Sequence, residues 1–272
     1  MLFLLSPSKS QDFTQDIPKN ITKFVSNTEF MNKSSEIISV YKQFSTKYLM
    51  KIFSVSENIA SLNVERFALW KKNPEITNVK PAIQAFTGTV YNSFEYEKYS
   101  QEQCEYADKN LKIISGLYGI ISPFSQIQPY RLEMGIRQSF TINNIEYKNL
   151  YDFWKPTLTQ KIITDCKANN TNIIINLASV EYSKILDKKK LIQENISIID
   201  IDFKILKTDI SGKEILKTVA IYAKKQRGKI MNWAIKNLIE TVEDVTKYPD
   251  ENFIFSQKNS TNKKLCFIWK QS

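Results

Sequence analysis

The 272-residue sequence contains no histidine. This absence excludes Ser-His-Asp and Cys-His nucleophile activation, HExxH metal sites and any acid-base step that uses imidazole. Three cysteines, Cys104, Cys166 and Cys266, are widely spaced and form no CxxC pair, so we expect neither a zinc site nor a redox pair. Iron capture fits poorly too, because carboxylates alone favour Mg, Ca or Mn. We therefore expect no metal and no cofactor, and an enzyme would have to use Lys, carboxylates, Tyr, Ser or Cys.

Glycine and arginine are scarce. There are six glycines, where average usage of about 7% would give roughly 19, and four of the 38 basic residues are arginines. Arg131 and Arg137 flank Gly135, and Arg227 precedes Gly228. Since lysine is the usual cation in this chain, an arginine is expected where a planar fork must bind a carboxylate or a phosphate.

The composition is otherwise that of a globular protein. Hydrophobic residues make up 42% of the chain and aromatic residues 12%, enough for a full core. The net charge of +10 favours a polyanionic partner such as nucleic acid, although a lysine-rich composition alone would also produce it. The first apolar run ends at Leu5, too early for a signal peptide or a membrane span, so we expect a cytoplasmic protein without a membrane partner.

The hydrophobic pattern predicts one mixed unit of helices around a sheet, without repeats or linkers. Strands are expected at residues 1–5 and 172–179, a short strand after a turn within 80–91, a β-hairpin over 196–223 and a strand pair over 252–269. Helices are expected over 28–72, 101–110 and 150–169, and after the hairpin, while 120–137 is expected to be irregular.

The stretch "LMKIFSVSENIA" (residues 49–60) has the layout of a helix-hairpin-helix element, which we place at about 45–72. In such an element a turn of the form small, apolar, small joins two helices, and the backbone N–H groups of the second helix point at a nucleic-acid phosphate. Ser54, Val55 and Ser56 fill this turn, and Ser56 is a natural N-cap. The alternative is an ordinary helix pair with Val55 in the core.

Three further segments could bind an anion. In "YAKKQRGKIMNW" (222–233) a strand is expected to lead into a helix. The N-terminus of this helix would place several cations around a bound anion, and the alternative is a solvated basic turn. In "LLSPSKS", Lys9 follows a buried strand, without the spacing of a P-loop. In "YRLEMGIR", Arg131 and Glu133 would share a face, so that one arginine is fixed on Glu133 while the other meets a ligand.

Taken in order, "LLSPSKS", "AFTGTVY", "LKIISGLYGIISPFSQIQPYRLEMGIR", "LYDFW", "INLASVEY" and "YAKKQRGKIMNWAI" resemble the YaaA family of bacterial peroxide-stress proteins. The resemblance implies an α+β protein, a single mixed α/β domain (residues 1–272) of unusual topology, with a basic cleft and a helix-hairpin-helix element that falls on residues 54–56. It also implies a cytoplasmic protein of the hydrogen-peroxide response that limits free iron and the resulting DNA damage, and that binds duplex and branched DNA. It implies no reaction.

Our main hypothesis is a non-enzymatic protein that binds DNA (duplex, bubble or junction) without sequence specificity, as a monomer in solution, with cooperative binding on DNA left open. The residues expected to contact DNA are Lys9, Lys51, Ser54, Val55, Ser56, Arg66, Lys224, Lys225, Arg227 and Lys229. The alternative is an enzyme acting on DNA or a small anionic substrate, with a buried lysine as nucleophile or base. Its candidate cleft residues are Ser6, Lys9, Arg131, Glu133, Arg137, Asp152, Tyr182 and Lys225.

Overall fold

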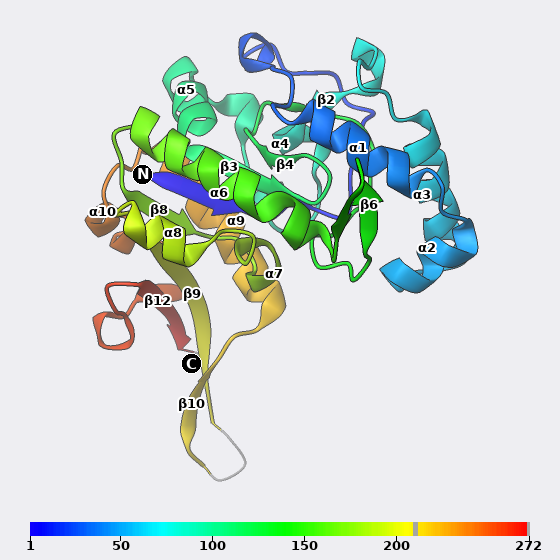
Figure 1. Ribbon diagram of the computed structural model, residues 1–272. Coiled ribbons are helices and arrows are strands. Elements are labelled where there is room, and N and C mark those ends of the chain that lie inside the picture. Colours follow the sequence, from blue (N-terminus) through cyan, green and yellow to red (C-terminus); the bar gives the residue numbers. More distant parts are fainter. Residues whose placement is uncertain (209–211, 271–272) are drawn as a thin grey trace.

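A mostly parallel sheet forms the centre of the structure, a computed structural model that describes residues 1–208 and 212–270 (Figure 1). Within those residues eight strands pair, and five of them run parallel in the spatial order β3-β1-β8-β9-β12. Antiparallel strands β4 and β11 close the two edges, and β10 pairs with the last residues of β9. The strands are β1 (Leu2–Leu5), β3 (Leu111–Ser115), β4 (Gly119–Ile121), β8 (Ile173–Asn176), β9 (Ser197–Thr208), β10 (Glu214–Lys217), β11 (Phe253–Phe255) and β12 (Lys264–Lys270).

The central strands are continuous apolar runs because helices cover both faces of the sheet. All four residues of β1 are buried, as are Ile174 and Ile175 of β8. The strands predicted at 1–5 and 172–179 are therefore confirmed, although β8 ends at Asn176. Numbered along the chain, the five parallel strands have the order 2-1-3-4-5, so the connections that leave β1 and β8 run to opposite sides.

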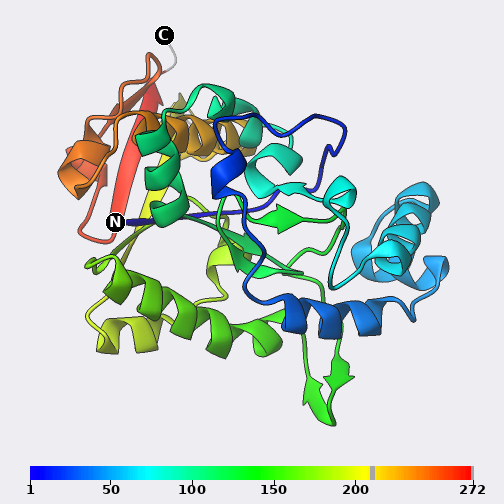
Figure 2. The ribbon, with the colours of Figure 1, turned by 90° about the horizontal axis from the view of Figure 1, so that it is seen from above.

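Helices α5 and α9 pack against one face of the sheet, and α6 and α8 lie on the other, as the view in Figure 2 shows. These helices are α5 (Gln101–Asn110), α9 (Ala220–Lys236), α6 (Leu150–Ala168) and α8 (Lys188–Gln193), with the short α7 (Val180–Ser183) and α10 (Val242–Thr246) beside them. No helix in the described part of the chain has the length and apolar character needed to cross a membrane. The single mixed domain is confirmed, but the α+β class is wrong, because the sheet is mostly parallel and is covered on both faces.

Three helices of the N-terminal half project beside the sheet: α1 (Met31–Tyr41), α2 (Thr46–Phe53) and α3 (Glu57–Leu69) (Figure 1). We call α2, α3 and the turn between them the helical hairpin. Ser45 caps α2 by accepting a hydrogen bond from the Tyr48 N–H, and Ser54 ends it with φ 52°, in the left-handed region. Phe53 and Phe67 pack edge to face between the two helices. The predicted helix, tight turn and second helix are therefore confirmed.

The remaining elements are short. Residues 80–91 contain the two-residue β2 and then the helix α4, in place of a turn entering a strand, because Ala82 to Ala85 are all buried and close a single helical turn. The segment 120–137 is irregular apart from β4 and β5, as predicted. The short elements are η1 (Thr22–Phe24), η2 (Ile76–Asn78), β2 (Lys80–Pro81), α4 (Ala82–Ala85), η3 (Tyr91–Ser93), η4 (Tyr96–Lys98), β5 (Gln126–Ile127), β6 (Phe140–Ile142), β7 (Ile145–Tyr147) and η5 (Gln257–Asn259).

The C-terminal half differs from the prediction at one place that matters for function. The β-hairpin and the final strand pair are confirmed, but β10 ends at Lys217 and α9 already begins at Ala220. The turn of the predicted β-hairpin lies partly outside the described residues. The stretch 222–233 is therefore the body of a helix, and the prediction of an anion site at a helix N-terminus there is wrong.

Candidate functional site

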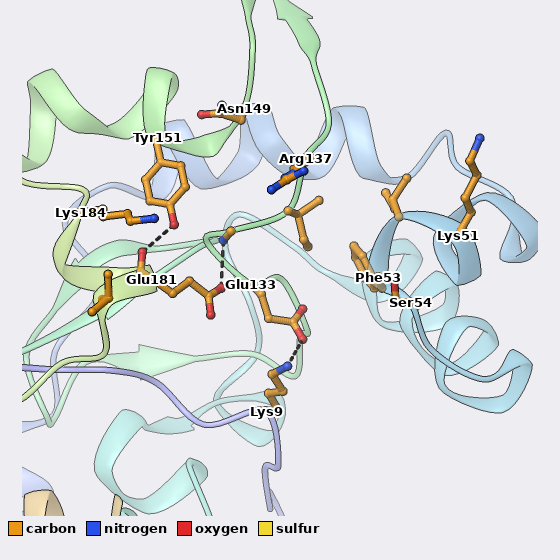
Figure 3. Close-up of a pocket in the computed structure, with 14 residues that line it drawn as sticks. Lys9, Lys51, Phe53, Ser54, Glu133, Arg137, Asn149, Tyr151, Glu181 and Lys184 are labelled. Carbon is orange, nitrogen blue, oxygen red and sulfur yellow. Dashed lines mark hydrogen bonds and ion pairs between the residues drawn. The ribbon is translucent and has the colours of Figure 1, made fainter. Parts of the chain in front are cut away.

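A pocket of about 920 Å³ lies outside the carboxyl ends of β1 and β8 (Figure 3). Lys9 follows β1, and Glu181 and Lys184 follow β8. The chain leaves β1 toward β3 and leaves β8 toward β9 on the other side, and such a switch point opens a crevice for ligands in parallel sheets. The end of α2, the segment 133–137 and the start of α6 complete the walls. The topology thus places the pocket where this type of sheet binds ligands.

One wall is made by residues 130–137, which we call the strap. Every second side chain of the strap is buried in the core: Tyr130, Leu132, Met134 and Ile136. Glu133, Gly135 and Arg137, which alternate with them, line the pocket. Gly116 holds the strap close, since a Cβ there would lie 2.3 Å from the carbonyl oxygen of Leu132. The strap therefore lies close against the sheet at Leu132 and turns at Met134 and Gly135, where the Ile136 N–H donates to the carbonyl oxygen of Glu133.

Glu133 is the centre of an ion cluster at the bottom of the pocket. Its Oε1 accepts hydrogen bonds from Nε of Arg131 at 3.1 Å and pairs with Nη2 of Arg131 and Nζ of Lys9, each at 3.0 Å. The side chains of Glu133 and Arg131 are 11% and 17% exposed, whereas that of Lys9 is 62% exposed. The prediction that one arginine is fixed on Glu133 is confirmed, and the paired residue is Arg131.

Arg66 of α3 adds a third cation to this cluster. Its pKa is lowered, first by burial and then by the positive charge of Arg131. Two arginines close enough to repel one another, with Lys9 beside them, exceed the charge that Glu133 can neutralise. The cluster therefore carries excess positive charge where the helical hairpin meets the strap.

Helix α7 is clamped against the strap from the opposite side. Oε1 of Glu181 accepts a hydrogen bond from the Gly135 N–H at 3.0 Å, and a Cβ at Gly135 would lie 3.0 Å from the same oxygen. The hydroxyl of Tyr151 donates to the backbone carbonyl of Glu181 at 2.6 Å. Burial raises the pKa of Tyr151, and the charge of Glu181 adds to this. These contacts fix the position of Lys184, which lines the pocket at the end of α7.

The helical hairpin forms the outer wall. Lys51, Phe53 and Ser54 line the pocket, and Figure 3 shows them across from Tyr151 and Lys184. Ser54 and Ser56 are exposed and Val55 is half-buried. Ser56 is the N-cap residue of α3, as predicted, although its hydroxyl accepts no hydrogen bond from the backbone of the described helix. The exposed turn and the pocket are thus continuous.

The basic residues of α9 lie elsewhere. Lys224 and Lys225 are exposed on the body of the helix and do not line the pocket. Arg227 is half-buried, and its pKa is lowered by burial, which outweighs the nearby charges of Asp202 and Asp200. Lys229 pairs with Asp250 at 2.9 Å. The structure therefore does not bring these four cations together with Lys9 and Lys51.

Three other candidates have structural contacts. Ser6 Oγ accepts a hydrogen bond from the Ser179 N–H at 2.9 Å, which ties β1 to the start of α7. Asp152 is exposed and accepts from the Lys148 N–H, so it shapes the turn before α6. Tyr182 is 6% exposed, and burial raises its pKa well above the ordinary value, which disfavours it as a proton donor near neutral pH.

The sequence prediction missed Tyr151 and Glu181, and it also missed Lys184. Glu181 and Lys184 could have been found from their position in the sequence, because they follow a buried parallel strand and ligand contacts concentrate after the carboxyl ends of such strands. Neither lysine named for the enzyme alternative is buried, since Lys9 is largely exposed and ion-paired and Lys225 is exposed. Within residues 1–208 and 212–270, no three His, Cys, Asp or Glu side chains gather as a metal site requires.

Comparison with known proteins agrees with the resemblance in the motifs. The family model described as peroxide stress protein YaaA matches residues 1–259. The chain is similar to a UPF0246 protein of Clostridium botulinum (strain Eklund 17B / Type B), with 35% identity over 267 residues that cover 98% of both chains. It is also 34% identical over 268 residues to a UPF0246 protein of Shewanella sp. (strain W3-18-1), again covering 98% of both chains. The chain therefore belongs to the YaaA (UPF0246) family of peroxide stress proteins.

Proposed function

We propose that this protein binds DNA without sequence specificity and thereby protects it from peroxide- and iron-dependent damage in the cytoplasm. The membership of a peroxide-stress family supplies the context. The observation that carries the proposal is the exposed turn of the helical hairpin, which opens directly onto a pocket containing several cations.

The turn has the features needed to hold a phosphate. Ser54 adopts a left-handed conformation (φ 52°), so that only three residues separate the end of α2 from the start of α3. The first N–H groups of an α-helix have no partner within the helix, and they carry partial positive charge. Because Ser54 and Ser56 are exposed, a DNA backbone can approach these groups without moving the core.

The surrounding charge extends the footprint beyond one phosphate. Lys47 and Lys51 are exposed and lie one turn apart on α2, so they share a face. Lys9, Arg137 and Lys184 line the adjoining pocket with Lys51. Contacts of this kind go to the DNA backbone and read no bases, which is why the proposed binding is independent of sequence.

The experiment is fluorescence anisotropy with labelled duplexes of unrelated sequences, over a salt series from about 50 to 200 mM. Neutralising roughly four to six phosphates gives a log-log slope of about −4 to −5, similar for every sequence. A slope near zero, or an affinity that depends strongly on sequence, would contradict the proposal.

A further inference from the structure

One polar atom in the pocket is unsatisfied. Glu133 is only 8% exposed, and its Oε1 binds Arg131 and Lys9, but its Oε2 is buried without a hydrogen-bond partner among the described residues. A buried carboxylate oxygen in that condition costs free energy, so it is expected to accept a hydrogen bond from something outside the chain. Because Glu133 lines the pocket, the missing donor is expected on a ligand.

The rest of the pocket restricts what this ligand is. Arg137 and Lys184 are exposed cations at its wall, and they call for an anionic group. Phe53 and Ile136 offer apolar surface, and the ring of Tyr151 lies on the opposite side (Figure 3). The volume of about 920 Å³ is that of a site for a medium-sized organic molecule. A bare anion would leave Oε2 of Glu133 without a donor, and a neutral molecule would leave the cations unused.

From these groups we infer that the pocket binds a nucleotide, with a base N–H donating to Oε2 of Glu133 and the phosphate held by Arg137 and Lys184. A nucleotide combines the three required features: a flat face, hydrogen-bond donors and an anion. It is either free in solution or a mispaired nucleotide turned out of a duplex held by the neighbouring helical hairpin. Only this second source rests on the proposed DNA binding.

The substitution Glu133→Gln reverses the proposed contact. Its amide oxygen is drawn to Arg131 and Lys9, because the NH₂ group would be repelled by them. The NH₂ then occupies the position of Oε2, where it presents a donor to the donor of the base. A nucleotide should therefore bind at least about tenfold more weakly, while binding of inorganic phosphate is unchanged or tighter, since one negative charge is gone.

The first test is calorimetric titration of the wild-type protein and Glu133→Gln with AMP, GMP, ribose 5-phosphate and inorganic phosphate. At least one nucleotide should bind wild type about tenfold more tightly than ribose 5-phosphate does, and Glu133→Gln should remove that advantage. Arg137→Gln, at an exposed side chain, is the second variant and should weaken binding of the nucleotide and of both phosphates. Equal affinity for nucleotide and ribose 5-phosphate would rule out a free nucleotide as the ligand.

The second test separates the two sources by comparing a paired duplex with one that carries a single mispaired nucleotide. If the nucleotide comes from DNA, wild type prefers the mispaired duplex and Glu133→Gln loses this preference while its affinity for the paired duplex remains. If the ligand is free, AMP or GMP binds and the preference is absent. No nucleotide binding together with no preference would overturn the inference, whereas loss of paired-duplex binding would affect only the proposed function.

Discussion

Removing the charge of Glu133 should destabilise the fold far more than removing that of Lys9. Glu133 and Arg131 are mostly buried, at 11% and 17% side-chain exposure, and they make two contacts of 3.0 to 3.1 Å. Breaking a buried pair by changing one partner typically costs about 3 to 5 kcal/mol, because the other charge stays buried. The Gln of Glu133→Gln still offers one acceptor, so we expect about 2 to 4 kcal/mol.

Lys9→Met provides the matched comparison. Lys9 contacts the same oxygen at a similar distance, but its side chain is 62% exposed. Exposed pairs are worth about 0.2 to 1 kcal/mol, so this variant should lose no more than about that amount. The two substitutions thus test whether burial, rather than distance, sets the energy of these contacts.

The assay is equilibrium unfolding in urea, followed by tryptophan fluorescence and far-UV circular dichroism. Glu133→Gln should lower the midpoint clearly with an unchanged slope, whereas Lys9→Met should barely move it. Inorganic phosphate should also restore part of the loss in Glu133→Gln, because the half-buried Arg131 is then left without its carboxylate. The reasoning is refuted if both variants lose the same free energy or if Glu133→Gln loses less than about 1 kcal/mol.

Three further predictions concern other parts of the molecule. Gly228→Ala should lower the free energy of unfolding by about 1 to 2 kcal/mol, because the new Cβ would lie 2.0 Å from the carbonyl oxygen of Val90. This loss should outweigh the better helix propensity of alanine, and an unchanged urea midpoint would contradict the prediction. Burial acts to raise the pKa of Asp250, but hydrogen bonds from Lys229 and other donors outweigh it, so the pKa is lowered. The free energy of unfolding of wild type should therefore exceed that of Asp250→Asn by a constant amount above about pH 4, and this difference should shrink as the pH falls below 3.8, the ordinary pKa of an aspartate. A difference that does not depend on pH between 3 and 7 in urea titrations would refute the prediction. Arg137→Gln should weaken DNA binding about two- to tenfold at a constant melting temperature, and DNA affinity equal to wild type would be the contrary result.

Much of the fold was predictable because its central strands and amphipathic helices have clear periods. The run around Ile174 and Ile175 is apolar throughout because helices cover both faces of the sheet. The two helices of the helical hairpin have apolar residues at helical spacing, and Ser45 caps the first of them. The α+β class followed from the family resemblance alone, whereas five strands of the sheet run parallel and β10 pairs only with the end of one of them.

The candidate site was predictable only where neighbours in sequence are neighbours in space. Arg131 and Glu133 pair across two residues, and the alternation of an extended segment is enough to predict it. The contact between Gly135 and Glu181 joins residues 46 apart and depends on the order of the strands, which the sequence does not reveal. The start of α9 was misplaced because "EILKTVAIYAKK" suits a strand, whereas α9 begins at Ala220 and packs closely on Val90 at Gly228.

The most direct test of the DNA-binding proposal is charge reversal on the helical hairpin. Lys47→Glu/Lys51→Glu reverses the charge of two exposed residues on α2. The control, Lys258→Glu/Lys263→Glu, makes the same change in charge at two exposed residues that precede β12. They lie near the amino-terminal end of this strand, whereas the pocket lies at the carboxyl ends of the parallel strands. DNA affinity measured by anisotropy at constant salt should fall at least about tenfold in the first variant and much less in the second, with equal melting temperatures. If both variants lose affinity equally, or neither does, the helical hairpin is not the DNA site and the proposal fails.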